Sequence, residues 1–156
     1  MKVRALTALI ACIVLSGCSY VYDVVAVFRD GVVQFTDTRS GLEQIVFGGR
    51  CLRSVWVTTS SGPAPIVSPG DDADLVNRHR TYWSESVAYE DDCANRLPLA
   101  YATPLSGEPV RDDPIGRVPP KALLPDVIYD IRTTTGATGY GHGRFVIRRD
   151  GRLENL

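Results

Sequence analysis

One stretch of the sequence gathers side chains that could do chemistry. Between Thr138 and Arg144, glycines alternate with Tyr140 and His142, so one face is bare and the other carries a phenol and an imidazole, with a guanidinium at the end. In a groove or a flexible loop, these side chains could bind a ligand or a partner. The same glycines are typical of a hairpin loop that needs positive φ, or of a strand packed closely beneath an aromatic ring. We favour a structural role for the glycines and keep Tyr140, His142 and Arg144 as the candidate ligand or partner loop.

The other reactive residues form no recognisable catalytic or metal-binding set. The chain has 2 histidines and no Gly-x-Ser-x-Gly motif, and a phosphate cradle is not expected because a strand follows Arg144. The acidic clusters Asp71–Asp74 and Glu90–Asp92 lack EF-hand spacing, so we interpret them as a helix start and a solvated turn rather than calcium ligands. The sequence therefore predicts no catalytic residue, no metal and no cofactor.

The pattern of residues at the N-terminus predicts a targeting segment. Lys2 and Arg4 precede an apolar run from Ala5 to Leu15, which has the order of a secretory signal peptide and is too short to span a bilayer. Leu15-Ser16-Gly17-Cys18 resembles the lipobox of bacterial lipoproteins. The resemblance implies cleavage of residues 1–17, acylation of Cys18 and a single lipid-anchored domain over 18–156. Because Ser19 rather than aspartate follows the cysteine, it also implies the outer membrane. An ordinary secreted protein with a coincidental cysteine is the alternative.

The loss of the signal segment leaves one pair of cysteines. Cys12 would leave with the signal and Cys18 would carry lipid, so Cys51 and Cys93 remain and predict a disulfide in an oxidising periplasm. A redox pair or half of a metal site is the alternative, although no Cys-x-x-Cys motif supports it.

The formal charge changes from −1 to −3 with the loss of Lys2 and Arg4. A mildly acidic domain without a basic patch is not expected to bind nucleic acid.

The positions around these residues read as short strands and turns. The 14 glycines and 10 prolines argue against a helical bundle. Alternating or β-branched runs predict strands, and the Asp30-Gly31 pair predicts a tight hairpin turn. Asp71–Arg80 is the one plausible helix. The strand-forming segments are Val24–Thr36 as a hairpin, Cys51–Thr59, Thr81–Tyr89, Leu97–Thr103, and a terminal hairpin over Val127–Thr134 and Arg144–Arg148.

The resulting fold class is all-β. We expect a small antiparallel sandwich or barrel with at most one short helix. Leu123-x-Pro125-x-x-x-Tyr129 resembles the tyrosine corner of fibronectin type III domains, in which the hydroxyl bonds back to the backbone at the entry to a strand. A fibronectin- or immunoglobulin-like arrangement is therefore one candidate, and a strand entered through a proline in another β fold is the alternative.

The tether indicates where the domain works. If the first strand begins near Val21, where a run rich in valine and aromatic residues starts, only Ser19 and Tyr20 separate it from Cys18, so an acylated domain would lie close to the bilayer. We expect a non-enzymatic, membrane-proximal binding or accessory module on the periplasmic face of the envelope. Its contacts would be the membrane, through acyl chains on Cys18, and an envelope protein or cell-wall component. The alternatives are a cell-envelope enzyme acting on glycan or peptide with a centre near His142, and a passive structural lipoprotein.

Overall fold

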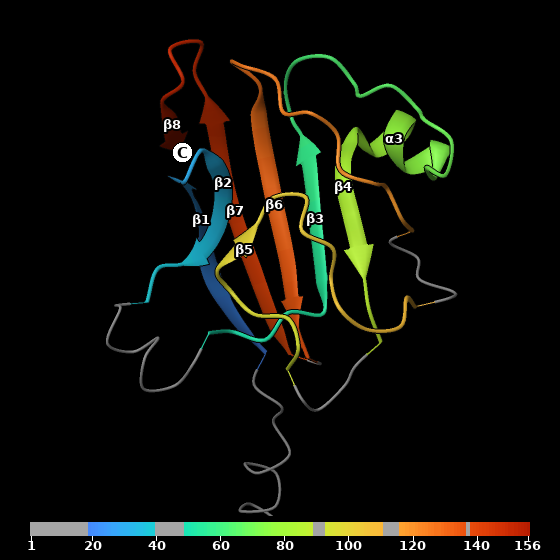
Figure 1. The fold of residues 1–156 in the computed structure, drawn as a ribbon, viewed down its shortest axis with the longest axis vertical. Coiled ribbons are helices and arrows are strands. Elements are labelled where there is room, and N and C mark those ends of the chain that lie inside the picture. The colour runs from blue at the N-terminus through green and yellow to red at the C-terminus, as the bar shows by residue number, and fades with distance from the viewer. Residues whose placement is uncertain (1–18, 40–48, 89–92, 111–115, 137) are drawn as a thin grey trace, which may run out of the picture.

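The computed structural model describes residues 19–39, 49–88, 93–110, 116–136 and 138–156. Eight strands and one short helix lie within these ranges (Figure 1). The fold is all-β with at most one short helix, as the sequence predicts. The elements are β1 (Tyr20–Arg29), β2 (Val32–Asp37), β3 (Ser54–Thr59), α3 (Ala73–His79), β4 (Thr81–Ser86), β5 (Leu99–Ala100), β6 (Ile128–Thr135), β7 (Gly139–Ile147) and β8 (Leu153–Asn155).

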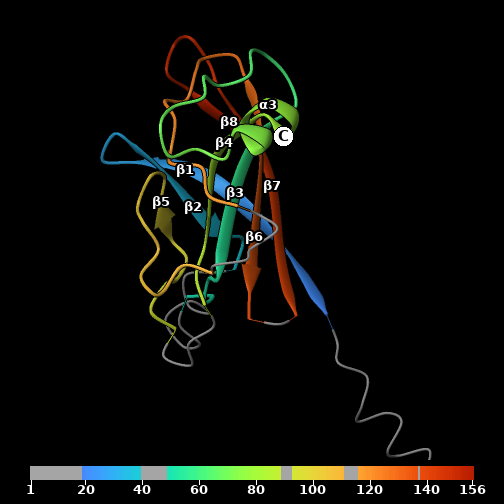
Figure 2. The same ribbon diagram turned by 90° about the vertical axis from the view of Figure 1, so that its right-hand side faces the viewer.

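The strands form one strongly curled sheet. Their order is β4-β3-β6-β7-β1-β2-β5, and β8 pairs with the C-terminal end of β7. The β1–β2 hairpin and β5 fold over the inner face of the other strands, so the sheet forms a half-barrel (Figure 2). Phe35 of β2 contacts Phe145 of β7 at a ring-centroid distance of 5.7 Å, and Trp83 contacts Tyr101 at 5.4 Å. These rings close the core between the two halves of the sheet.

Two hairpins form where the sequence predicts them. β1 and β2 pair in antiparallel register around Asp30 and Gly31, which both have positive φ, at 53° and 78°. Asp-Gly suits this turn because its two central positions need left-handed backbone that glycine and aspartate tolerate. β6 and β7 pair along their whole length, from Ile128 opposite Val146 to Thr135 opposite Gly139.

One ladder departs from the antiparallel expectation. The first four residues of β1 run parallel to β7, with Tyr20 beside Gly139 and Asp23 beside His142. Beyond this point β1 leaves β7, and the Asn155 side chain of β8 takes its place by bonding both backbone groups of Ala26, at 2.8 and 2.9 Å. The mixed ladder arises because β1 belongs to both halves of the curled sheet.

The helix covers the outer face near β4. Asp72 caps it by accepting hydrogen bonds from the backbone of Asp74 and Leu75 at 3.0 and 3.2 Å. Its buried side chains, Leu75 and Val76, form a small second core with Val118 and the partly buried Trp56. The predicted helix over Asp71–Arg80 is confirmed, one or two residues shorter at each end.

Tyr129 makes the local bond of a tyrosine corner. Its hydroxyl accepts a hydrogen bond from the backbone N–H of Leu124 at 2.7 Å, at the entry to β6. Burial of the ring raises the pKa of Tyr129, although the Leu124 bond lowers it somewhat. The bond fixes how the chain enters β6, and it does not extend the fibronectin resemblance beyond these residues.

Candidate functional site

The glycine stretch that the sequence singles out is a strand and not a loop. All of Gly139–Arg144 lies in β7, so the idea of a flexible presenting loop is corrected. A side chain on Gly141 would meet ring atoms of Tyr22 at 2.5 and 2.6 Å. The Tyr22 ring crosses Gly141 and its hydroxyl lies 2.7 Å from that of Thr133, one strand further on. The same arrangement is repeated two residues earlier by Tyr20, Gly139 and Thr135.

The third glycine has a different neighbour. A Cβ on Gly143 would collide with the backbone carbonyl of Val24, at the point where β1 stops pairing with β7. Glycine is needed here because another backbone crosses at close range. The three glycines therefore hold β7 tightly against β1, which makes this part of the strand well supported on its inner face.

Tyr140, His142 and Arg144 lie together on the opposite, outer face of β7. Tyr140 is 42% exposed, and the other two side chains are also exposed. Arg144 donates from Nε to the Asp130 carboxylate at 2.7 Å, across the β6–β7 ladder. The structure thus brings the three predicted residues onto one surface, in alternate positions along one strand.

The neighbouring strands add residues that the sequence did not associate with this site. Opposite His142 lie Arg132 on β6 and Asp23 on β1, and opposite Tyr140 lie Thr134 and the 69% exposed Val21. Residues paired in register project from the same side of a sheet. We call this surface the β7 outer face. It consists of Val21, Asp23, Asp130, Arg132, Thr134, Tyr140, His142 and Arg144.

The β7 outer face combines an exposed tyrosine and histidine with charged side chains. The His142 side chain makes no hydrogen bond or ion pair with any residue that the structure describes, so none of these residues orients its imidazole. The Thr134 hydroxyl is occupied by that of Ser54, at 2.6 Å. On this surface Tyr140 lies with Arg144, which is paired with Asp130, and with Arg132, which makes no ion pair with a described residue. An open surface with tyrosine and arginine is a common form of protein-binding site.

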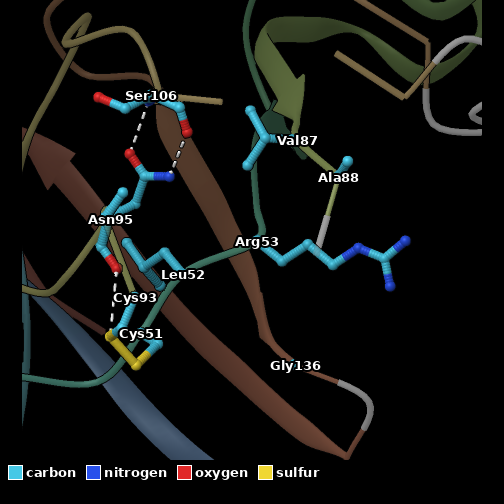
Figure 3. A pocket seen from close by; sticks show the side chains of 10 residues that line it. Cys51, Leu52, Arg53, Val87, Ala88, Cys93, Asn95, Ser106 and Gly136 are labelled. Carbon is cyan, nitrogen blue, oxygen red and sulfur yellow. Dashed lines mark hydrogen bonds between the residues drawn. A yellow bond between two sulfur atoms is a disulfide. The ribbon is translucent and has the colours of Figure 1, made fainter. Parts of the chain in front are cut away.

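A disulfide lies near the end of the sheet at which β1 begins. Cys51 and Cys93 are bonded, with 5.1 Å between their Cα atoms, and the predicted pairing is confirmed. Asn95 exchanges two hydrogen bonds with the backbone of Ser106, at 2.7 and 2.8 Å, beside a hollow of about 30 Å³ (Figure 3). That volume holds no more than a few waters. This hollow is therefore part of the packing around the disulfide.

A larger hollow lies at the opposite end of the sheet. We call it the Pro63–Leu124 groove; it measures about 390 Å³, and its lining also includes Ile66, Tyr82 and Lys121. The Lys121 ammonium donates to the Asp71 carboxylate at 2.6 Å, and the Asp71 side chain is completely buried. Burial raises the pKa of Asp71, but the Lys121 ammonium and the Ser68 N–H lower it by more, so this pKa lies below its ordinary value of 3.8.

The Pro63 side of this groove lies outside the segments for which the sequence predicts a strand or a helix. The available signal was a run of apolar residues, Pro-Ala-Pro-Ile-Val, in a segment that forms no strand. The opposite wall comes from residues near Leu124, and no local pattern relates two segments so far apart in the chain.

No protein-family model matches the chain, and neither the curated proteins nor the solved structures contain a match.

Among the described residues, no helix is long and apolar enough to cross a bilayer, and no three His, Cys, Asp or Glu side chains gather in a metal-binding group. Cys18 and residues 1–17 lie outside the described ranges, as do Glu90–Asp92.

Proposed function

We propose that this protein is a non-enzymatic lipoprotein of the bacterial envelope, which binds a partner close to the membrane through the β7 outer face. It would be anchored by acyl chains on Cys18, face the periplasm and reside in the outer membrane. The lipobox resemblance supports the anchor. Strand β1 begins at Tyr20, two residues after Cys18, so the sheet starts within about 7 Å of the acylated residue.

The observation that carries the binding role is the support of Tyr140, His142 and Arg144 by one rigid strand. The glycines between them pack beneath Tyr20 and Tyr22, so the outer side chains project from a backbone that has little freedom to move. A preordered surface loses less entropy on binding than a flexible loop does. Tyrosine and arginine are also the residues most often found at the energetic centres of interfaces.

A cross-linking experiment in intact cells tests the proposal. A photoreactive amino acid would replace Tyr140 in the full-length protein, and a matched variant would carry it at Val32, an exposed hairpin residue that is 43% accessible. We expect one dominant envelope adduct from position 140 that is absent from position 32. Arg132→Ala and His142→Ala should weaken this adduct. The same adducts from both positions would contradict a role for the β7 outer face.

The anchor needs its own test. The intact mass of protein extracted from membranes should show the loss of residues 1–17 and acyl chains on Cys18. A Cys18→Ser variant should lack the acyl mass and leave the membrane fraction. An unacylated mature chain would point to an ordinary secreted protein and would remove the membrane-proximal part of the proposal.

An envelope enzyme is a second candidate because Asp23 lies beside His142 in the β1–β7 register. An acid next to a histidine is a common beginning of a general-base site. Turnover of cell-wall glycan or peptide by the purified protein, abolished by both His142→Ala and Asp23→Asn, would favour this function over a binding module.

A further inference from the structure

The Pro63–Leu124 groove has one wall made of extended backbone. Proline fixes φ near −65° and disfavours helical conformation in the residue before it, so Pro63 and Pro65 hold Ala64 extended. The backbone N–H and C=O groups of Ala64 and Ile66 make no hydrogen bond with any described residue. In extended chain, residues two apart direct these groups to the same side. The wall therefore has an unpaired backbone edge next to an apolar hollow.

The side chains around the groove are apolar and partly open to solvent. Ile66 is 85% exposed and Leu124 38%. A volume of about 390 Å³ lies within the range of sites that bind ligands or peptide side chains. The Tyr82 hydroxyl adds one polar group to the lining. It donates only a long hydrogen bond, of 3.3 Å, to the Pro63 carbonyl.

The charge of the groove limits what can occupy it. Lys121 is the one cation in its lining, and it is neutralised by the Asp71 carboxylate 2.6 Å away. An ion of either sign would gain little from a pair whose charges cancel, and it would lose hydration on entering an apolar hollow. The complementary occupant is therefore uncharged.

We propose that the Pro63–Leu124 groove binds an extended, uncharged apolar segment of another polypeptide. The segment would pair its backbone with Ala64 and Ile66 and place alternate side chains in the hollow, as in peptide recognition by strand addition. The two chain segments that line the groove lie at the end of the sheet away from the start of β1 (Figure 1). This second site is independent of the β7 outer face and of the lipid anchor.

Peptide binding by the full-length protein in phosphatidylcholine nanodiscs tests this inference. The probe is an end-blocked, fluorescein-labelled seven-residue peptide of alternating valine and threonine, and binding is followed by fluorescence polarisation. The groove variant is Ile66→Lys, and the matched control is Val32→Lys, which adds the same charge at an exposed apolar residue elsewhere. Because both side chains are exposed, neither change should affect folding.

We expect saturable binding by the unchanged protein and by Val32→Lys, and binding about tenfold weaker by Ile66→Lys. A probe that is N-methylated at every residue should not bind, because neither of its edges can then donate hydrogen bonds to the backbone edge of the groove. No binding of the plain probe, or equal binding by Ile66→Lys, would overturn the proposal. Retained binding of the N-methylated probe would also overturn it, in favour of a simple apolar ligand such as an acyl chain. None of these readouts depends on acylation or on an envelope partner.

Discussion

The hydroxyl of Tyr22 lies 2.7 Å from the hydroxyl of Thr133, and Gly141 lies beneath the ring that joins them. The tyrosine belongs to β1, the glycine to β7 and the threonine to β6, so one side chain ties three strands together. Arg50 covers the other face of the same ring, with its guanidinium carbon 4.4 Å from the ring centroid. The glycine is therefore a fixed part of a packed stack and not a point of flexibility.

Replacement of Gly141 by alanine should be strongly destabilising. The new methyl group would press against the Thr133 hydroxyl and lie 2.5 Å from the nearest ring carbon of Tyr22, and these two side chains hold each other in place by their hydrogen bond. We expect a loss of roughly 2–3 kcal/mol in the free energy of unfolding, measured by urea denaturation. His142→Ala on the same strand should change it by less than about 0.5 kcal/mol.

A double variant separates this clash from an intrinsic preference for glycine. In a Tyr22→Ala background the ring is gone and the Thr133 hydroxyl, no longer bonded to Tyr22, is free to turn away from the Gly141 methyl, so Gly141→Ala should cost less there than in the unchanged protein. Equal costs in the two backgrounds would show that the ring is not the reason for the glycine.

Tyr129→Phe should remove the bond that fixes the entry to β6. The Leu124 N–H would lose its acceptor, and we expect a loss of about 1 kcal/mol in the free energy of unfolding. Tyr140→Phe, at an exposed hydroxyl, is the matched control. An unchanged stability of Tyr129→Phe would mean that water replaces the hydroxyl.

The same tyrosine predicts how stability responds to alkali. Burial raises the pKa of Tyr129 in the folded protein, so the folded state holds this proton more tightly than the unfolded chain does. Its stabilising contribution is complete below the unfolded pKa of about 10 and is lost as the pH rises above it. Urea denaturation between pH 9 and about 11 should therefore show a steeper decline for the unchanged protein than for Tyr129→Phe.

Loss of the disulfide should lower stability by about 4 kcal/mol, because Cys51 and Cys93 are separated by 42 residues in the chain. Cys51→Ser should melt at a lower temperature, and reductant should lower the melting temperature of the unchanged protein in the same way. The doubly substituted Cys51→Ser, Cys93→Ser protein should not respond to reductant. A melting temperature that is insensitive to reduction would show that the bond adds nothing to stability.

Asp71→Asn should weaken the protein and change its response to acid. The variant loses the charged partner of Lys121, which we expect to cost about 2 kcal/mol. Because the pKa of Asp71 is depressed in the folded state, its contribution is present above the unfolded value near 3.9 and is lost as the pH falls below it. In the variant, the free energy of unfolding should therefore lack the part of its decrease at low pH that comes from protonation of Asp71. Asp74→Asn, at a side chain 59% exposed, is the control and should retain it.

The sequence predicts those elements whose signals are local. Asp30 and Gly31 mark their hairpin because few other residue pairs tolerate that turn, and the alternation from Val127 to Thr134 places Tyr129 and Ile131 in the core. The cysteine pairing is predicted because Cys51 and Cys93 are the two of the four cysteines that remain once Cys12 and Cys18 are assigned to the signal and the anchor. Asp72 marks the helix start because its side chain satisfies otherwise unpaired N–H groups.

Relations between distant segments could not be predicted in this way. The glycines of β7 suggest either a loop or a strand beneath a ring, and only the pairing with β1 shows that Tyr20 and Tyr22 supply the rings. The parallel direction of that ladder leaves no trace in the alternation of either strand. Asp23 joins His142 through the same long-range register, and Pro63 and Leu124 line one groove although no local pattern relates their two segments.

The place of β1 in the sheet determines how the molecule responds to a pull at its N-terminal end. β1 is an interior strand, paired first with β7 and then with β2, and its last part is bridged by Asn155. A force along this strand, directed out of the sheet, loads its hydrogen bonds in parallel instead of opening them one at a time from an edge. Tension applied at the start of β1 would therefore be shared among β7, β2 and β8 instead of falling on a single edge ladder.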